Sequence, residues 1–114
     1  RMRAFTLDAL ADGLLEAAIL VRYETVMRPE ALRWPEWIDG QTDKIERALD
    51  AFAGAWLDHL AGRLDIGTIA AGCALGYLDF RFADRDWRRG RGELAAWYAR
   101  FAERPAMRAT LPTG

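Results

Sequence analysis

The sequence predicts an all-α protein, a helical bundle of four to five helices in which two helices are long. Apolar residues recur at helical spacing along the chain, and no stretch alternates apolar and polar residues as a half-buried strand would. The chain has 114 residues, of which 52% are hydrophobic and 29% are charged. This size and composition indicate one globular domain that spans residues 1–114.

The first helix is expected to run from Thr6, which can cap it, to about Met27. One face should point to the core, and it carries Leu10, Leu14, Ala17 and Val21. The opposite face is polar at its start and apolar at its end, and it carries Asp8, Asp12, Leu15, Ile19 and Tyr23. The segment MRPEALRWPEW contains two prolines and is therefore expected to be a connection.

A second long helix is expected from about Pro35 to Leu60. Pro35 suits the first helical turn, where its missing N–H is not needed. Gly62 is placed to end this helix in a left-handed conformation. The stripe expected to face the core consists of Trp37, Ile38, Gln41, Ile45, Ala48, Leu49, Phe52 and Trp56.

A third helix is expected over residues 66–81. Asp65 can be its N-cap, because its carboxylate can accept from the backbone N–H of Gly67 or Thr68. Thr68 can complete a capping box by accepting from the Asp65 N–H, although it is a weaker partner there than a carboxylate would be. Both sides of the helix are apolar, so it should be central and covered all round, with Cys73 buried and inert. The small residues that would let neighbouring helices approach are Gly67, Gly72 and Gly76.

The glycines in GRLDIGTIAAG have nearly the spacing of a phosphate-binding loop, which is the alternative interpretation of this stretch. Such a loop needs a lysine after its second glycine and a strand before its first. Here Thr68 follows Gly67 directly, a helical pattern precedes, and Asp65 would repel phosphate. The start of a buried helix is therefore the favoured interpretation.

The fourth helix is expected over about residues 93–103, with Leu94, Trp97, Tyr98 and Phe101 at helical spacing. The connection before it, ADRDWRRGRG, is rich in arginine, and its Trp87 could stack on a nucleic-acid base. Aspartates interleave with these arginines, however, and the net charge of the chain is −1. A solvated loop with ion pairs is therefore favoured over a nucleic-acid site. The tryptophans of the helical stripes are assigned to the core rather than to a ligand cage.

The sole histidine and the sole cysteine give no recognisable site. His59 has no evident carboxylate or nucleophile as a partner, so it is expected to complement the C-terminal end of its helix. One histidine and one cysteine make a metal site improbable. A single cysteine cannot form an internal disulfide, and this fits a cytoplasmic protein. The longest apolar run, about Ile66 to Leu78, is shorter than the roughly 20 residues of a membrane helix.

Three segments resemble the C-terminal all-helical domain of glutathione S-transferases. GRLDIGTIAAGCALGYLDFRF is similar to the central helix of that domain, although the two capping-box residues are swapped in type. ALADGLLEAAILVRYE resembles the domain's first helix, especially in a bacterial subgroup that includes the YibF-like proteins. LAAWYARFAERPAM resembles its late segment, although Gly92 stands where proline is common before this helix. The resemblance extends over almost the whole chain.

The resemblance implies that this chain is part of a larger protein. A glutathione transferase has an N-terminal thioredoxin-like domain, which holds glutathione as co-substrate and supplies the catalytic residue. No stretch here matches that domain, so no catalytic residue is carried over, and the chain, which begins with Arg1 rather than Met, is expected to be a fragment. The resemblance also implies a homodimer and a small electrophilic substrate. The net charge of −1 and the short apolar runs indicate no nucleic-acid or membrane partner.

In such enzymes the helical domain lines the cleft for the electrophile, and the mixed face of the first helix is the place to expect it. The candidate cleft residues are Asp12, Leu15, Ile19, Arg22 and Tyr23. The same face could instead pack against the thioredoxin-like domain or a second subunit. A different class of function also stays open, because this fold serves as a non-enzymatic protein-interaction module in some translation factors and synthetases.

Overall fold

A computed structural model describes residues 2–104, with side chains from residue 5 onward. This part of the chain is helical and contains no strand, which confirms the predicted fold class. The elements are α1 (Met2–Arg22), η1 (Tyr23–Met27), η2 (Glu30–Leu32), α2 (Pro35–Ala53), α3 (Leu57–Gly62), α4 (Ile66–Arg81) and α5 (Gly92–Ala102). The short element η1 is a π-helix and η2 is a 3-10 helix. None of the helices within residues 2–104 has the length and apolar character needed to cross a membrane.

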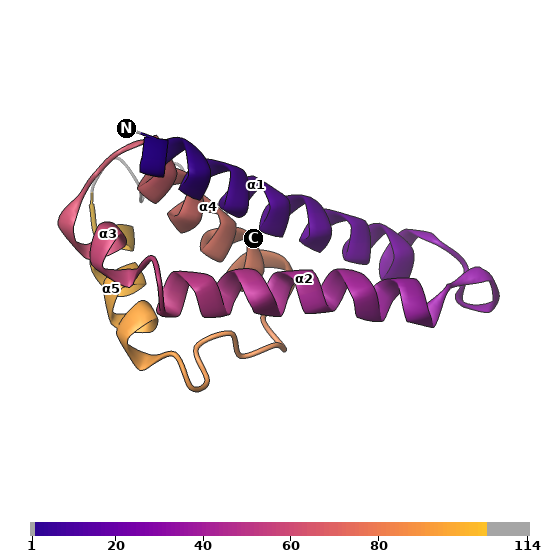
Figure 1. Cartoon of the computed structure of the whole chain (residues 1–114). Coiled ribbons are helices and arrows are strands. Elements are labelled where there is room, and N and C mark those ends of the chain that lie inside the picture. The colour runs from indigo at the N-terminus through magenta and orange to yellow at the C-terminus, as the bar shows by residue number, and fades with distance from the viewer. Residues whose placement is uncertain (1, 105–114) are drawn as a thin grey trace.

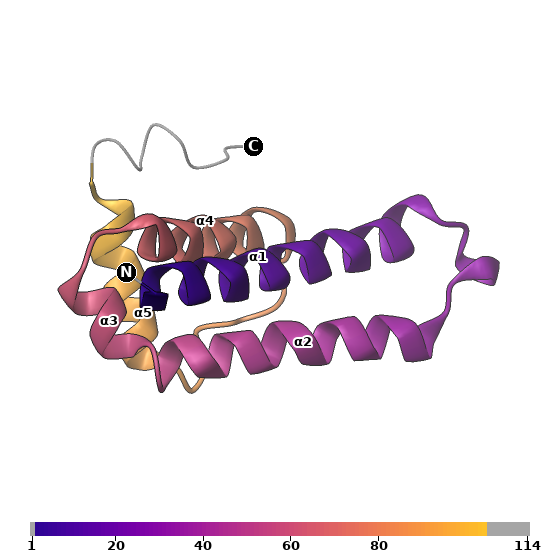
Figure 2. The same cartoon turned by 45° about the horizontal axis from the view of Figure 1, so that its top comes forward.

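Helix α1 is the centre of the bundle and packs against both α2 and α4 (Figures 1 and 2). Helices α3 and α5 lie at the end of the bundle where α1 begins. The connection between α1 and α2 lies at the opposite end, beyond the end of α4. The last turns of α1 and the first turns of α2 are therefore less covered than the rest of the bundle.

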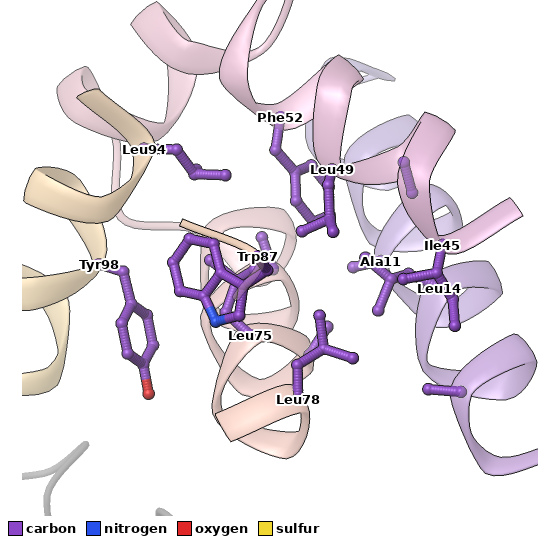
Figure 3. Close-up of a cluster of buried hydrophobic side chains, with 14 of the residues drawn as sticks. Ala11, Leu14, Ile45, Leu49, Phe52, Leu75, Leu78, Trp87, Leu94 and Tyr98 are labelled. Carbon is purple, nitrogen blue, oxygen red and sulfur yellow. The ribbon is translucent and has the colours of Figure 1, made fainter. Parts of the chain in front are cut away.

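The core is a single cluster to which each of the five α-helices contributes. Its largest fully buried side chains include Phe52, Leu49, Leu14 and Leu75. Figure 3 shows these side chains gathered between α1, α2 and α4. The fully or almost fully buried residues of α1 are Leu7, Ala11, Leu14, Ala17, Ala18 and Val21. Three of the four residues predicted for the core face are thus buried, whereas Leu10 is only partly buried and packs against the edge of the core.

Trp87 closes the core from the connection between α4 and α5 (Figure 3). Its indole is 3% exposed, packs edge-on against the ring of Tyr98, and donates from Nε1 to Oδ1 of Asp79 at 2.9 Å. The guanidinium of Arg88 donates to both oxygens of Asp79, at 2.7 and 2.9 Å. The loop is thus ion-paired as expected, and Trp87 is unavailable for stacking on a base.

The single second helix that the sequence predicts is broken near its end. Helix α2 stops at Ala53, a turn follows, and α3 begins at Leu57. At the break the backbone of Gly54 leaves helical geometry with φ −107° and ψ −92°. The helical spacing continues across the break, because Trp56 still packs against the core, and this is why periodicity did not reveal it.

Two further terminus predictions were wrong. Gly62 is the last residue of α3, and the chain leaves that helix through Arg63 in an extended conformation, so no left-handed glycine is needed. Gly90 is the one glycine with positive φ within the described residues, at 74°. The first helix starts at Met2, which places Thr6 inside it rather than at its cap.

Helix α4 spans residues 66–81 as predicted, and glycine at position 72 lets another helix approach it closely. A Cβ added at Gly72 would overlap the ring of Phe101 in α5. Helix α5 lays Leu94, Trp97 and Phe101 against the rest of the bundle, and all three are buried. Glycine lowers the helix propensity at this position, but its lack of a side chain lets the Phe101 ring contact the α4 backbone.

The start of α4 is held by a capping box. Oδ1 of Asp65 accepts from the Thr68 backbone N–H at 3.0 Å, and Oγ1 of Thr68 accepts from the Asp65 N–H at 2.8 Å. The other carboxylate oxygen, Oδ2, lies 2.9 Å from Nε2 of the buried His59 in α3. His59 thus has the carboxylate partner that the sequence did not reveal, and one side chain joins α3 to α4.

The surroundings of Asp65 also set its protonation. Burial alone would raise the pKa of its carboxyl, but hydrogen bonds from the Thr68 backbone and from His59 outweigh burial and lower the pKa below 3.8. The charged form is therefore the one that the folded structure stabilises.

Replacing Asp65 by alanine should lower the melting temperature. The change removes the acceptor of the Thr68 N–H and the partner of His59, so we expect a loss of about 1–2 kcal/mol, which is roughly 5–10 °C for a domain of this size. Thermal denaturation followed by circular dichroism measures it. The control is Asp65→Asn, which keeps an acceptor for the N–H and should lose less. An unchanged melting curve for Asp65→Ala would disprove the capping role.

The same carboxylate should make stability depend on acid pH. Because its folded pKa is lowered, the unfolded state binds more protons, and the stabilisation is complete only above the unfolded pKa of about 3.8. It is lost as the pH falls through the folded pKa. We expect the difference in melting temperature between the wild type and Asp65→Asn to be larger at pH 5 than at pH 3. A difference that stays constant over this range would contradict a charge-specific role.

Candidate functional site

A shallow apolar hollow lies between the end of α1 and the end of α4, and we call it the α1–α4 hollow. It has a volume of about 500 Å³. Its lining residues are Ile19, Arg22, Tyr23, Met27, Tyr77, Phe80 and Arg81. The side chains of Tyr23 and Met27 are 59% and 67% exposed, so an apolar and partly aromatic surface faces solvent here. A hollow of this kind can take up a small apolar molecule and remove water from it.

Side chains with polar groups also line the α1–α4 hollow. Arg22 and Arg81 each bring a guanidinium to the lining, and the Arg81 group lies 4.1 Å from the centre of the Phe80 ring. Tyr23 and Tyr77 add phenol hydroxyls, which can donate a hydrogen bond. The arrangement can therefore bind an apolar molecule that carries, or develops, negative charge at one end.

The structure brings three of the five candidate cleft residues together. Ile19, Arg22 and Tyr23 line the α1–α4 hollow. Leu15 is partly buried and packs against the core one turn earlier, and Asp12 is exposed outside the hollow, closer to the start of α1.

The α4 side of the hollow was not anticipated. Tyr77, Phe80 and Arg81 lie at the end of α4, and periodicity could place the first two on one face of that helix but could not tell what the face meets. The sequence signal for this surface was that α4 is apolar on two faces, although the core of the domain covers only one of them. The pairing with Ile19 and Tyr23 required the packing of α1 on α4.

Helix α4 is not covered all round, contrary to the prediction. Its second face is open at Ile66, Ile69 and Cys73, and it continues through the half-buried Tyr77 and Phe80 into the α1–α4 hollow. The reason is that α1 and α5 pack against the opposite side of α4, and no element within residues 2–104 lies over this one. Cys73 is thus exposed rather than buried, although partial desolvation still raises the pKa of its thiol.

A buried carboxylate supports the wall that carries Tyr23 and Met27. Glu24 is 7% exposed, although it lies in the π-helix η1 at the protein's end. Its Oε1 pairs with Arg28 at 2.9 Å, and its Oε2 accepts from the backbone N–H of Trp34 at 2.8 Å. Trp34 is the residue just before α2, so Glu24 ties the end of α1 to the start of α2. No sequence motif points to Glu24.

Other side-chain clusters of the described residues serve the fold. Arg91, from the loop before α5, pairs with Glu46 at 2.9 Å and with Asp50 at 2.8 Å, and so joins that loop to α2. No group of three or more His, Cys, Asp or Glu side chains in this part of the chain is arranged to hold a metal ion.

A family model described as "Glutathione S-transferase, C-terminal domain" matches residues 35–100, which is more than half of the chain. The chain belongs to the glutathione S-transferase C-terminal domain family. The family model extends from the start of α2 into α5, so it includes the whole of α4 and its capping box. The resemblance that the sequence motifs indicate is thereby confirmed.

Individual relatives of this glutathione S-transferase domain are bacterial. The uncharacterized GST-like protein YibF of Escherichia coli K12 is 32% identical over 113 residues, which are 97% of this chain and 55% of that protein. A glutathione transferase family member from Pseudomonas fluorescens Pf-5, with bound S-(propanoic acid)-glutathione, is 48% identical with a TM-score of 0.96. It is matched by 100% of this chain and over 58% of its own length.

A third relative extends the comparison to another genus. A glutathione S-transferase from Methylobacterium radiotolerans, in complex with glutathione sulfonate, is 34% identical with a TM-score of 0.83, over 97% of this chain and 53% of that one. The chain therefore spans a little over half the length of these relatives.

Replacing Glu24 should loosen the wall of the α1–α4 hollow. Glu24→Ala leaves the Trp34 N–H without its acceptor and Arg28 without its partner, so we expect a loss of roughly 1–2 kcal/mol of stability and faster amide exchange over residues 23–34. Hydrogen exchange read by mass spectrometry measures this. The matched variant Glu24→Gln retains an acceptor and should exchange more slowly than Glu24→Ala. Equal exchange in both variants and in the wild type would refute the anchoring role.

Proposed function

We propose that this domain forms the helical wall of the substrate cleft in a glutathione transferase, where the sulfur of glutathione attacks an electrophile. The observation that carries the proposal is the α1–α4 hollow, an exposed apolar surface with hydrogen-bond donors around it. Membership of the family supports it, as does the S-substituted glutathione bound to the Pseudomonas fluorescens relative. The enzyme would add glutathione to its substrate or reduce the substrate at the expense of glutathione.

In this proposal the hollow holds the electrophile and not the glutathione. Ile19, Met27 and Phe80 remove water from its apolar part, which strengthens electrostatic interactions nearby. Tyr23 or Arg22 donates a hydrogen bond to the negative charge that develops on the electrophile as sulfur attacks. The thiolate itself would be provided and stabilised by the thioredoxin-like half of the enzyme, so this domain supplies no catalytic nucleophile.

The open face of α4 is the surface that we assign to contact with the rest of the protein. Ile66 and Ile69 are 52% and 36% exposed, and a stripe of this kind on a helix is normally covered. We propose that the thioredoxin-like domain covers it and that Asp12 and Leu15, on the adjoining side of α1, take part in that contact or in a homodimer. The whole enzyme is then a cytoplasmic homodimer that acts on small electrophiles.

Two substitutions in the full-length protein test the cleft. Ile19→Ala removes apolar contact and should lower kcat/KM for bulky aryl electrophiles about fivefold to tenfold, mainly through KM. Tyr23→Phe removes a donor and should lower kcat by about tenfold for electrophiles that develop an oxyanion. Steady-state kinetics over a series of electrophiles, at saturating glutathione, measures both effects. Val26→Ala is the control, because Val26 is exposed on η1 outside the hollow.

The kinetic pattern distinguishes the cleft from the other roles of this face. Wild-type kinetics for Ile19→Ala and Tyr23→Phe with every electrophile would refute the cleft assignment. A full-length protein that is not retained on immobilised glutathione and has no conjugating activity would instead favour the non-enzymatic protein-interaction module.

A further inference from the structure

A second hollow lies at the other end of α4, and arginines line it. We call it the arginine hollow. It has a volume of about 350 Å³ and lies between the connection from α3 to α4 and the last turn of α5. Its charged lining residues are Arg63, Arg100 and Arg104, which come from the α3–α4 connection, from α5 and from just beyond α5. Arg63 is distant from the other two in sequence, so only the fold brings this positive charge together.

The arginines of this hollow have no ion-pair partner among the described residues. No acidic side chain lines it, and none of its arginines forms an ion pair or a side-chain hydrogen bond within residues 5–104. Some other arginines of the structure do pair with carboxylates, as Arg88 does with Asp79 and Arg91 with Glu46. Three unpaired arginines around one hollow are thus a local excess in a chain whose net charge is −1.

The acidic residue closest in sequence to Arg63 is already engaged. One oxygen of Asp65 accepts from the Thr68 N–H and the other lies 2.9 Å from Nε2 of His59, and neither forms an ion pair with Arg63. Helix C-terminal ends attract cations, and this accounts for an arginine after α3 or near the end of α5. It does not account for the concave space that these arginines share.

The remaining lining gives the hollow a floor. Trp97 and Phe101 of α5 are 6% and 3% exposed, and they line the hollow together with the buried Thr68 of α4. These side chains are held by the core, and the backbone around Thr68 is held by the capping box. One side of the hollow is therefore built from buried side chains, and its three arginines are exposed to solvent, where a ligand can reach them.

We propose that the arginine hollow binds a small, multiply charged oxyanion, a phosphate or sulfate group either free or on a compact organic molecule. Guanidinium groups match such anions because each can donate two parallel hydrogen bonds to two oxygens. The concave shape favours a small molecule over a polymer. The site lies at the N-terminal end of α4, whereas the α1–α4 hollow lies at its C-terminal end, so the proposal is independent of the substrate cleft.

Calorimetric titration of the full-length protein with pyrophosphate tests the proposal. We expect saturable binding with one site per chain, weakening as the salt concentration rises. Arg63→Gln, Arg100→Gln and Arg104→Gln should each weaken binding about tenfold, because each removes a charge-assisted hydrogen bond. Arg89→Gln is the matched control, since Arg89 is an exposed arginine of the α4–α5 connection outside the hollow, and it should bind as the wild type does.

The results of these titrations either support or overturn the arginine hollow as an oxyanion site. Loss of affinity in the three hollow variants, with wild-type affinity in Arg89→Gln and unchanged melting curves in all four, supports the site. Absence of saturable binding by the wild type overturns it. An equal, small weakening in all four variants also overturns it, because that result describes a general charge effect rather than a site. A second titration with phenyl phosphate shows whether the hollow accepts an organic group, and binding of pyrophosphate alone restricts the ligand to inorganic oxyanions.

Discussion

The carboxylate of Asp65 joins two helices of the bundle at the point where α4 begins. It begins α4 by accepting from the Thr68 N–H, and it ties that start to His59 in α3. The position of α4 then decides the rest, because α4 carries the core residues that meet α1 and the glycine that admits Phe101 of α5. A carboxylate can join α3 to α4 in this way because its two oxygens bind two separate partners. Neither contact can then shift without affecting the other.

Both hollows are consequences of where α4 lies. Its C-terminal end meets the end of α1 and leaves an apolar surface that includes Tyr77 and Phe80, and its N-terminal end meets α5 beside the arginines. The two surfaces differ in chemistry because different neighbours complete them. The π-helix η1 brings Tyr23 and Met27 to the first, and α5 with the residues just after it brings Arg100 and Arg104 to the second. One helix can therefore present an apolar site and a cationic one.

The exposed apolar stripe of α4 is best considered beside the relatives of this domain, which are longer than this chain. Ile66, Ile69 and Cys73 lie on a helix that is apolar on both sides, and the helices of this domain cover only one side. The relatives have nearly twice the length of this chain, and the resemblance implies a thioredoxin-like domain as their other half. The contact that we propose with that other half would cover this stripe, and contiguous exposed apolar surfaces commonly mark such contacts.

What the sequence determined by itself was local. Helical periodicity predicted the bounds of α4 and the buried face of α1, and the spacing of Asp65 and Thr68 predicted the capping box, because these features depend on residues within a few positions of each other. Only the tertiary structure decided which face of α4 is covered, that His59 pairs with Asp65, that Glu24 holds Trp34, and that Arg63 lies near Arg100. Each of these depends on how two helices or connections pack. Periodicity shows that a face is apolar, but it does not show which partner lies against that face, or whether any does.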